Sequence, residues 1–317
     1  MKRALLVGID TYDAFDALSG CVNDVVATAP LLARNDDGLP NFDCQILANA
    51  RQGVGRDRLR QAVTKLLAPG ADVALLYAAG HGIERNGEVV LATTDGTPQT
   101  PGIGMPEILA AAAHSTVREV ILILDCCFSG AVAQVPQMAS DAAVLRPGIA
   151  ILTASRNDQP AAETVERRGL FSTMLCDGLA GGAADVLGKV TIGGLYAYLS
   201  ECFGPWDQRP MLKANIEREH ELRRCPSAVP LANIRRLPLL FPTPDHEFLL
   251  DPSYEPDALP PHPENERIFA ILQQCRSAKL LVPIGTEHLY FAAMESRSCQ
   301  LTPLGRHYRH MAEKGWL

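Results

Sequence analysis

The sequence lacks any long apolar run, since no stretch approaches the roughly 18 apolar residues that a membrane-spanning helix needs. Residues 1–8 pass at once into a short apolar stretch, which leaves no room for a signal peptide. Positive charge is also in deficit, because 29 Lys and Arg face 36 Asp and Glu for a net charge of −7. That balance argues against a general nucleic-acid coat. We expect a cytoplasmic protein with neither a membrane nor nucleic acid as partner.

A cysteine framework is missing as well. The chain has 9 cysteines, an odd number, with no spacing typical of a disulfide scaffold or a zinc knuckle. We therefore expect reduced thiols and no metal site. With 317 residues, 47% of them hydrophobic, the chain is long enough for one large domain and a small one.

Two apolar stretches each end in residues suited to catalysis. Residues 121–124 (ILIL) are followed by Asp125 and then by Cys126 and Cys127. Residues 73–79 are followed by His81, which lies between two glycines. Such runs are typical of buried parallel strands, whose carboxyl ends are where sites form in α/β sheets. Two neighbouring strands of this design would place a thiol beside an imidazole, the minimum for a cysteine nucleophile and its base.

Strands and helices alternate through the first part of the chain, which predicts a mainly parallel sheet covered by helices on both faces. Asn23 or Asp24 is the expected cap of the first helix. The expected strands are residues 4–9, 43–47, 73–77 (ending towards His81), 88–92, 117–124 and 148–155, and the expected helices are residues 25–33, 56–67, 106–113, 171–179 and 191–199.

The composition changes after residue 238. Residues 239–263 are rich in proline and are expected to form a linker between a first domain, residues 1–238, and a small second domain, residues 264–317. In the second domain the pattern predicts a helix at 264–275, then two hairpin arms at 280–284 and 289–293. A last helix follows, with Thr302 as its cap and Pro303 at its first position.

Histidines and cysteines are more often structural than catalytic, so each candidate needs a reason. His81 sits between glycines at a strand end, where packing does not ask for an imidazole and where glycines let a substrate approach closely. Cys126 and Cys127 precede a Ser-Gly turn that presents side chains at the sheet edge. Six further cysteines are interpreted as small buried hydrophobes: Cys44, Cys176, Cys202, Cys225, Cys275 and Cys299.

At this point a family resemblance appears. Residues 77–82 (YAAGHG) and 125–130 (DCCFSG) resemble the two catalytic signatures of the caspase-like cysteine peptidases, in particular the metacaspase and bacterial caspase branch. The histidine precedes the cysteine by 46 positions, close to the ~50 of caspases. The resemblance covers roughly residues 1–215 and includes further motifs at residues 5–10, 18–24, 153–155, 169–172 and 188–191.

The resemblance implies a caspase-like α/β sandwich and roles for individual residues. The family motif Asp-x-Cys-x-Ser-Gly selects Cys127, not Cys126, as the nucleophile of an acyl transfer, with His81 as its base and acid. Backbone N–H groups of Gly82 and Cys127 are the expected oxyanion donors. Phe128 departs from the histidine common at this position, which is not the base.

Substrate preference is expected to follow from charge. Asp24 and Asp125 stand where metacaspase-like enzymes carry the acids that bind Arg or Lys, and two carboxylates suit a guanidinium. The resemblance therefore implies cleavage of proteins at basic sites, after Arg and then Lys. The alternative is structural, with Asp24 as a helix cap and Asp125 as a strand-end acid.

Regulation is implied by the same resemblance. Residues 131–147 replace the loop that is cut when caspases are activated, and Arg146 is their single basic residue, so it is the candidate self-cleavage site of a zymogen; Arg167 and Arg168 lie further on. Many metacaspases need calcium held by clustered aspartates, but only Asp141 and Asp158 lie nearby. No cofactor is therefore expected, and a calcium requirement is left as an alternative.

The last domain is similar to the second half of winged-helix domains. Residues 264–317 carry five acidic and seven basic residues, a charge of +2 that is too small for a DNA-binding assignment. We expect a docking module for an upstream activating protease or sensor, in a bacterial stress, antiviral defence or cell-death pathway. Two alternatives remain: a catalytically silent caspase-like scaffold, and a cleavable regulator whose tail binds DNA.

Overall fold

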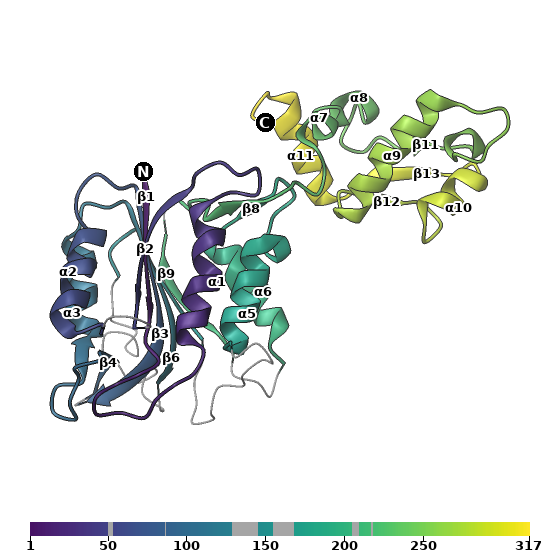
Figure 1. Ribbon diagram of the computed structural model, residues 1–317. Helices are drawn as coiled ribbons and strands as arrows, with labels where there is room; N and C mark the ends of the chain where they lie inside the picture. Colours follow the sequence, from purple (N-terminus) through teal and green to yellow (C-terminus); the bar gives the residue numbers. More distant parts are fainter. Residues whose placement is uncertain (50–52, 86, 129–144, 155–167, 205–208, 217) are drawn as a thin grey trace. The chain divides into compact units, whose positions relative to one another are not determined.

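The computed structural model describes residues 1–317 except 50–52, 86, 129–144, 155–167, 205–208 and 217, and for Cys127 and Phe128 it describes the backbone alone (Figure 1). The chain forms two compact units. The first contains Met1–Ala184 and Lys189–Cys225, and the second contains Asp185–Gly188 and Pro226–Leu317. These bounds differ from the expected domain limits at residues 238 and 264.

The first unit is built on an eight-stranded sheet with the main order β2-β1-β3-β6-β7-β9. Neighbours along this path are parallel except for β9, which runs antiparallel to β7. The expected mainly parallel sheet is confirmed. The six strands of this path are β1 (Lys2–Gly8), β2 (Phe42–Ala48), β3 (Val73–Arg85), β6 (Glu119–Phe128), β7 (Ile149–Thr153) and β9 (Met211–Asn215).

Strand β3 is longer than its sequence pattern predicts. It does not end towards His81 but continues to Arg85. Beyond the part that pairs with β6, it forms an antiparallel pair with β4 (Glu88–Ala92), which in turn pairs with β5 (Gly102–Gly104). This hairpin supplies the backbone partners that let the strand continue past the glycines.

Helices cover both faces of the sheet (Figure 1). On one face, α2 (Arg56–Leu66) and α3 (Met105–His114) share a core with alternate strand residues such as Leu5 and Val7. On the other face, α1 (Cys21–Ala33), α5 (Leu170–Asp177) and α6 (Ile192–Cys202) pack against the intervening set. The alternation of strand side chains thus divides the hydrophobic residues between two cores. Gly178–Gly182, β8 (Lys189–Val190) and β10 (Arg223–Arg224) complete this unit.

Helix α1 is capped from a distance. It begins at Cys21 behind Gly20, so Asn23 and Asp24 lie within its first turn and the expectation that either is the cap is wrong. Instead, the Asp10 carboxylate at the end of β1 accepts hydrogen bonds from the N–H groups of Cys21 (2.9 Å) and Val22 (3.3 Å). This contact fixes the start of the helix that carries Asp24.

The second unit has its own core and a small sheet of order β11-β13-β12, antiparallel throughout. Phe241 and Leu250 are buried in that core, so the proline-rich stretch is packed structure and not a linker. Residues 289–293 form a helix and not the expected hairpin arm. The expected cap is confirmed, because Thr302 Oγ1 accepts from the Gly305 N–H at 3.1 Å. The elements are α7 (Leu231–Ile234), α8 (Leu237–Leu240), β11 (Phe248–Leu249), a 3₁₀ turn (Pro252–Tyr254), α9 (Pro263–Ser277), β12 (Leu281–Pro283), α10 (Leu289–Met294), β13 (Ser298–Leu301) and α11 (Pro303–Glu313).

Among the described residues, no helix has the length and apolar character needed to cross a membrane.

Candidate active site

The strand register brings the predicted nucleophile and base together. In the parallel pair of β3 and β6, His81 is the partner of Cys127, and Ala79 is the partner of Asp125. Both pairs lie in the carboxyl-terminal part of the two strands. Directly paired residues of adjacent strands have their Cα atoms about 5 Å apart. The backbones of His81 and Cys127 are therefore close enough for the two side chains to share a site.

The imidazole of His81 is held from two sides. Its Nε2 lies 2.8 Å from the Asp16 carbonyl oxygen, and its ring packs against Tyr12 with centroids 4.8 Å apart. Because a carbonyl oxygen only accepts, Nε2 carries the hydrogen, which leaves Nδ1 as the basic nitrogen of the neutral ring. The Tyr12 hydroxyl also accepts the His81 backbone N–H at 2.9 Å and donates to the Ile9 carbonyl at 3.0 Å.

The neighbouring cysteine belongs to the interior. Cys126 is buried in the core on the α2 and α3 face, and its Sγ lies 3.5 Å from the Ala78 carbonyl oxygen. The choice of Cys127 over Cys126 as the nucleophile stays a prediction. The side chain of Cys127 lies outside the described part of the structure, so its role stays a prediction.

The predicted oxyanion donors share the same edge of the sheet. Gly82 is buried in β3, where it pairs with Phe128 of β6 and with Leu91 of β4. It follows His81 directly, and Cys127 lies one position before Phe128. The assignment of their N–H groups to an oxyanion stays a prediction.

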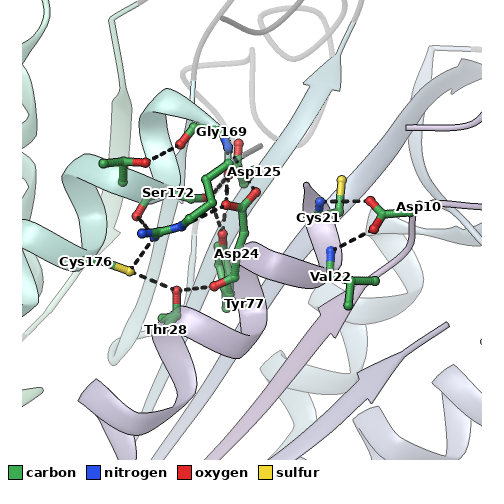
Figure 2. Close-up of polar contacts among 12 residues, drawn as sticks. Asp10, Cys21, Val22, Asp24, Thr28, Tyr77, Asp125, Gly169, Ser172 and Cys176 are labelled. Atoms are coloured by element: carbon green, nitrogen blue, oxygen red, sulfur yellow. Dashed lines mark hydrogen bonds and ion pairs between the residues drawn. The ribbon is translucent and has the colours of Figure 1, made fainter. Parts of the chain in front are cut away.

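The two predicted specificity acids are close together (Figure 2). A Cβ placed on Gly169 would lie 3.4 Å from Asp24 Oδ2 and 3.5 Å from Asp125 Oδ2. Asp24 comes from the first turn of α1, Asp125 from β6, and Gly169 precedes α5. Residues of four elements that are distant in the sequence thus form one acidic cluster, called the acidic pocket below and defined as Asp24, Asp125, Ser172 and Tyr77.

Asp24 is buried, with 3% of its surface exposed. The Gly169 N–H donates to its carboxylate, at 3.2 Å to Oδ1 and 3.4 Å to Oδ2. Arg168 Nε lies 3.6 Å from Oδ1. Burial, followed by repulsion from Asp125, raises the pKa of Asp24 to about 7 in spite of these partners. Both causes disfavour the charged form of this carboxyl.

The carboxylate of Asp125 is hydrogen-bonded to two hydroxyl groups of the acidic pocket. Its Oδ2 accepts from the Ser172 hydroxyl and lies 3.3 Å from the Tyr77 hydroxyl, while the two hydroxyl oxygens are 2.6 Å apart. Ser172 and Tyr77 are fully buried. Burial raises the pKa of Asp125, and these two hydroxyl groups oppose the rise. Burial likewise raises the pKa of Tyr77, so its hydroxyl remains a donor.

Arg146 lies at the other end of the strands. Its guanidinium donates to the carbonyl oxygens of Ala112 (3.1 Å), Val117 (2.8 Å) and Pro147 (2.7 Å). Val117 precedes β6, whereas Cys127 is near the end of that strand. Self-cleavage at Arg146 stays a prediction, and it would require these three bonds to open.

The calcium alternative stays a prediction. Asp141 and Asp158 both lie outside the described residues. Within the part of the chain that the structure describes, no group of three or more His, Cys, Asp and Glu side chains is arranged to hold a metal ion.

Sequence reasoning missed five contributors to the site, among them Tyr77, which lies in the histidine motif without an assigned role. Tyr12 and Asp16 lie in a loop whose pattern does not reveal that it returns to β3. Ser172 was part of a family motif but had no assigned role, and Arg168 was noted only as a basic residue. For the serine, the hydroxyl directly after a Gly-Leu-Phe helix start was a usable signal; the other contacts depend on tertiary structure.

β3 and β6 pair a histidine with a cysteine in a parallel α/β sheet, an arrangement that suits a cysteine nucleophile and its base. Residues 1–200 match the family model described as Caspase domain (Peptidase C14), so the chain belongs to this family of cysteine peptidases. No curated protein matches the chain.

Two solved structures are similar to this fold. One is a protein from Geobacter sulfurreducens, with a TM-score of 0.51 and 16% identity over 68% of this chain and 94% of that chain. Another is caspase-1 from Spodoptera frugiperda, with a TM-score of 0.46 and 13% identity over 70% of this chain and 92% of that chain. At 16% identity, the likeness to the Geobacter protein concerns the fold alone.

Proposed function

We propose that this chain is a cysteine endopeptidase that cleaves proteins after Arg, or after Lys, through a dyad of Cys127 and His81. The observation that carries the proposal is the register of β3 and β6, in which these two residues are partners. The family match supports the reaction class.

The reaction follows from the chemistry of the dyad. The Cys127 thiol gives its proton to Nδ1 of His81, and its sulfur attacks the scissile carbonyl carbon. The N–H groups of Gly82 and Cys127 stabilise the resulting oxyanion. His81 then protonates the departing amine, and a thioester remains. Water attacks the thioester as His81 takes a proton, which releases the acid and restores the thiol.

The loop that contains Tyr12 and Asp16 orients the His81 ring. With Nε2–H engaged by the Asp16 carbonyl, the ring keeps Nδ1 available for proton transfer. The packing of Tyr12 against the ring restricts its rotation. The ring is therefore already held in the orientation needed for proton transfer, and it loses little conformational entropy when the substrate binds.

Substrate preference rests on the acidic pocket. Asp24 supplies the charge, and Asp125 is held beside it by Ser172 and Tyr77. A guanidinium is planar and can engage carboxylate oxygens in pairs, whereas an ammonium cannot, so Arg is preferred to Lys. An acidic substrate side chain would meet like charge.

The test is a panel of peptides that differ only in Arg, Lys, Asp or Ala before the scissile bond. Wild type should cleave the Arg peptide fastest, and Cys127→Ala should lose about 10⁴-fold or more in kcat. Cys126→Ala is the matched control and should retain activity within a few fold. Preference for Asp, or loss of activity in the Cys126 variant alone, would overturn the assignment.

The silent-scaffold alternative makes a different prediction for the same preparation. A scaffold would cleave no peptide in the panel and would not react with an arginyl chloromethyl ketone. Covalent labelling of wild type therefore separates the two functions without knowledge of the natural substrate.

For the second unit we propose a docking role that ties the peptidase to an activating protease or sensor, in a bacterial stress, defence or cell-death pathway. Its near-neutral charge supports a protein partner over DNA. Retention of the full chain on duplex DNA at physiological salt would instead favour the cleavable-regulator alternative.

A further inference from the structure

The acidic pocket already contains a cation from the same chain. Arg168 Nε lies 3.6 Å from Asp24 Oδ1, and the two side chains are only 15% and 4% exposed. The carboxylate that a substrate guanidinium would need is therefore covered by Arg168 and by the Gly169 N–H. A substrate arginine that binds Asp24 Oδ1 must therefore compete with Arg168 for the same oxygen.

The Arg168 side chain is also fixed at its far end. Its Nη2 donates to the Ser172 carbonyl oxygen at 3.3 Å and to Cys176 Sγ at 3.0 Å, both on α5 (Ser172 and Cys176 are labelled in Figure 2). A buried guanidinium is tolerated when it has both a counter-charge and hydrogen-bond acceptors. Arg168 has both, so its position is built into the fold.

The contact with Asp24 is nevertheless weaker than a substrate could make. At 3.6 Å the ion pair is longer than a hydrogen bond, which is 3.5 Å at most. An arginine with two short hydrogen bonds to a carboxylate binds more strongly than a single long contact. The pocket is therefore occupied by a group that a better ligand can replace.

The second acid does not offer a substitute. Asp125 Oδ2 is already engaged by Ser172 and lies beside Tyr77. With Arg168 in place, the positive guanidinium compensates the charge of Asp24, so the pocket presents little net negative charge to a second cation.

We propose that Arg168 is a specificity-determining residue that occupies the arginine position of the acidic pocket and competes with the substrate side chain for Asp24. This inference rests on the proposed preference for Arg. The affinity that a substrate shows is then its intrinsic affinity reduced by the fraction of molecules in which Arg168 has moved away. Such a pocket selects substrates that bind well enough to displace the internal arginine, and it binds weak cations poorly.

The test measures binding separately from catalysis. In a Cys127→Ala chain, calorimetry gives the dissociation constant of benzamidine, a planar cation that resembles the end of an arginine side chain. Arg168→Ala should lower that constant about tenfold, which corresponds to an internal arginine in place nine times in ten. Arg168→Gln, which keeps hydrogen-bond donors for Ser172 and Cys176, should act in the same direction and serves as the second variant if the alanine chain does not fold.

The matched control is Arg118→Ala, which removes an exposed arginine before β6, at the far end of the same sheet. It should leave benzamidine binding unchanged. In the chain with Cys127 intact, Arg168→Ala should lower KM for the Arg peptide and leave kcat nearly unchanged. A role in folding alone would not produce this split.

Equal or weaker benzamidine binding in both Arg168 variants would overturn the competition, because it would mean that Arg168 is neutral or helps to build the pocket. If such a result accompanies normal cleavage after Arg, the proposed function stands and the inference fails. If benzamidine binds more tightly in the variants but no peptide is cleaved by the intact chain, the competition stands and the proposed function fails.

Discussion

His81 on β3 and Cys127 on β6 are partners in the register of two adjacent parallel strands. The pairing belongs to the central ladder of the sheet, which has buried helices on both faces. A one-residue slip of either strand would move its side chains to the opposite face and expose two cores. The pairing of His81 with Cys127 is therefore held by the same packing that stabilises the domain.

Gly80→Ala should impair catalysis through Tyr12. An added Cβ would lie 2.7 Å from the Tyr12 hydroxyl, which accepts the His81 N–H and bonds the Ile9 carbonyl. The tyrosine must move, and the ring packed on it loses its support. We expect about a tenfold or greater loss of kcat with a stability cost of about 1–3 kcal/mol.

The control for this change is Gly104→Ala, because a Cβ there meets nothing closer than Pro106 Cδ at 3.5 Å. Peptide cleavage and thermal melting of both variants provide the comparison. Equal activity of the two variants would refute the supporting role assigned to Tyr12.

Asp24→Asn should change the dependence of stability on pH. Burial and the neighbouring Asp125 raise the pKa of Asp24 to about 7, against 3.8 in an unfolded chain. Between these values the native state binds the proton more tightly than the unfolded state, so wild type loses stability as pH rises from about 4 to about 7. The asparagine variant has no such loss. The Tm of the variant relative to that of wild type should therefore be higher at pH 8 than at pH 5.

Asp72→Asn is the control of opposite sign. The N-terminal ammonium group hydrogen-bonds the Asp72 carboxylate and lowers its pKa. This acid stabilises the native state when ionised, so its replacement should lower Tm slightly at pH 8 and less at low pH. An Asp24 variant that behaves like the Asp72 variant would contradict the raised pKa.

Asp10→Ala should destabilise the start of α1. It removes the acceptor for the N–H groups of Cys21 and Val22, and loss of a helix cap costs about 1 kcal/mol, with a range of 0.5–2. Because the same first turn carries Asp24, KM for the Arg peptide should rise more than kcat falls. Asp10→Asn retains one acceptor oxygen and should lie between the alanine variant and wild type in both measurements.

Cleavage after Arg146 should be slow and intermolecular. Three backbone carbonyl groups hold this side chain beside the starts of β6 and β7, at the opposite end of β6 from Cys127. A Cys127→Ala chain incubated with wild type should therefore be cut after Arg146 at a rate that rises with enzyme concentration, as mass spectrometry can show. A fully active preparation that stays intact, or a substrate chain cut elsewhere, would rule Arg146 out.

Local patterns predicted most elements of the first unit, because continuous apolar runs and amphipathic repeats report burial directly. They missed the continuation of β3 to Arg85, since that part of the strand depends on the hairpin with β4. They also misread residues 289–293, a short apolar stretch that suits a strand or a helix equally. In both cases the secondary structure is determined by contacts with residues that are distant in the sequence.

The site shows the same division. His81, Cys127, Asp24 and Asp125 were identified from motifs, and the structure brings the two acids together around Gly169. The cap at Asp10 and the pairing of Arg168 with Asp24 have no local signature, because 11 residues separate the first contact and 144 residues separate the second. The role of Arg168 in particular becomes visible only from its contacts with α1 and α5.

The central claim is that the thiol of Cys127 and the imidazole of His81 act as a pair, and labelling by an arginyl chloromethyl ketone tests it most directly. Peptide mapping of the labelled wild-type chain should find the reagent on Cys127, and His81→Ala should slow the labelling at least about tenfold. Labelling of Cys127 at the same rate in the His81 variant, or labelling of another cysteine in its place, would contradict the account.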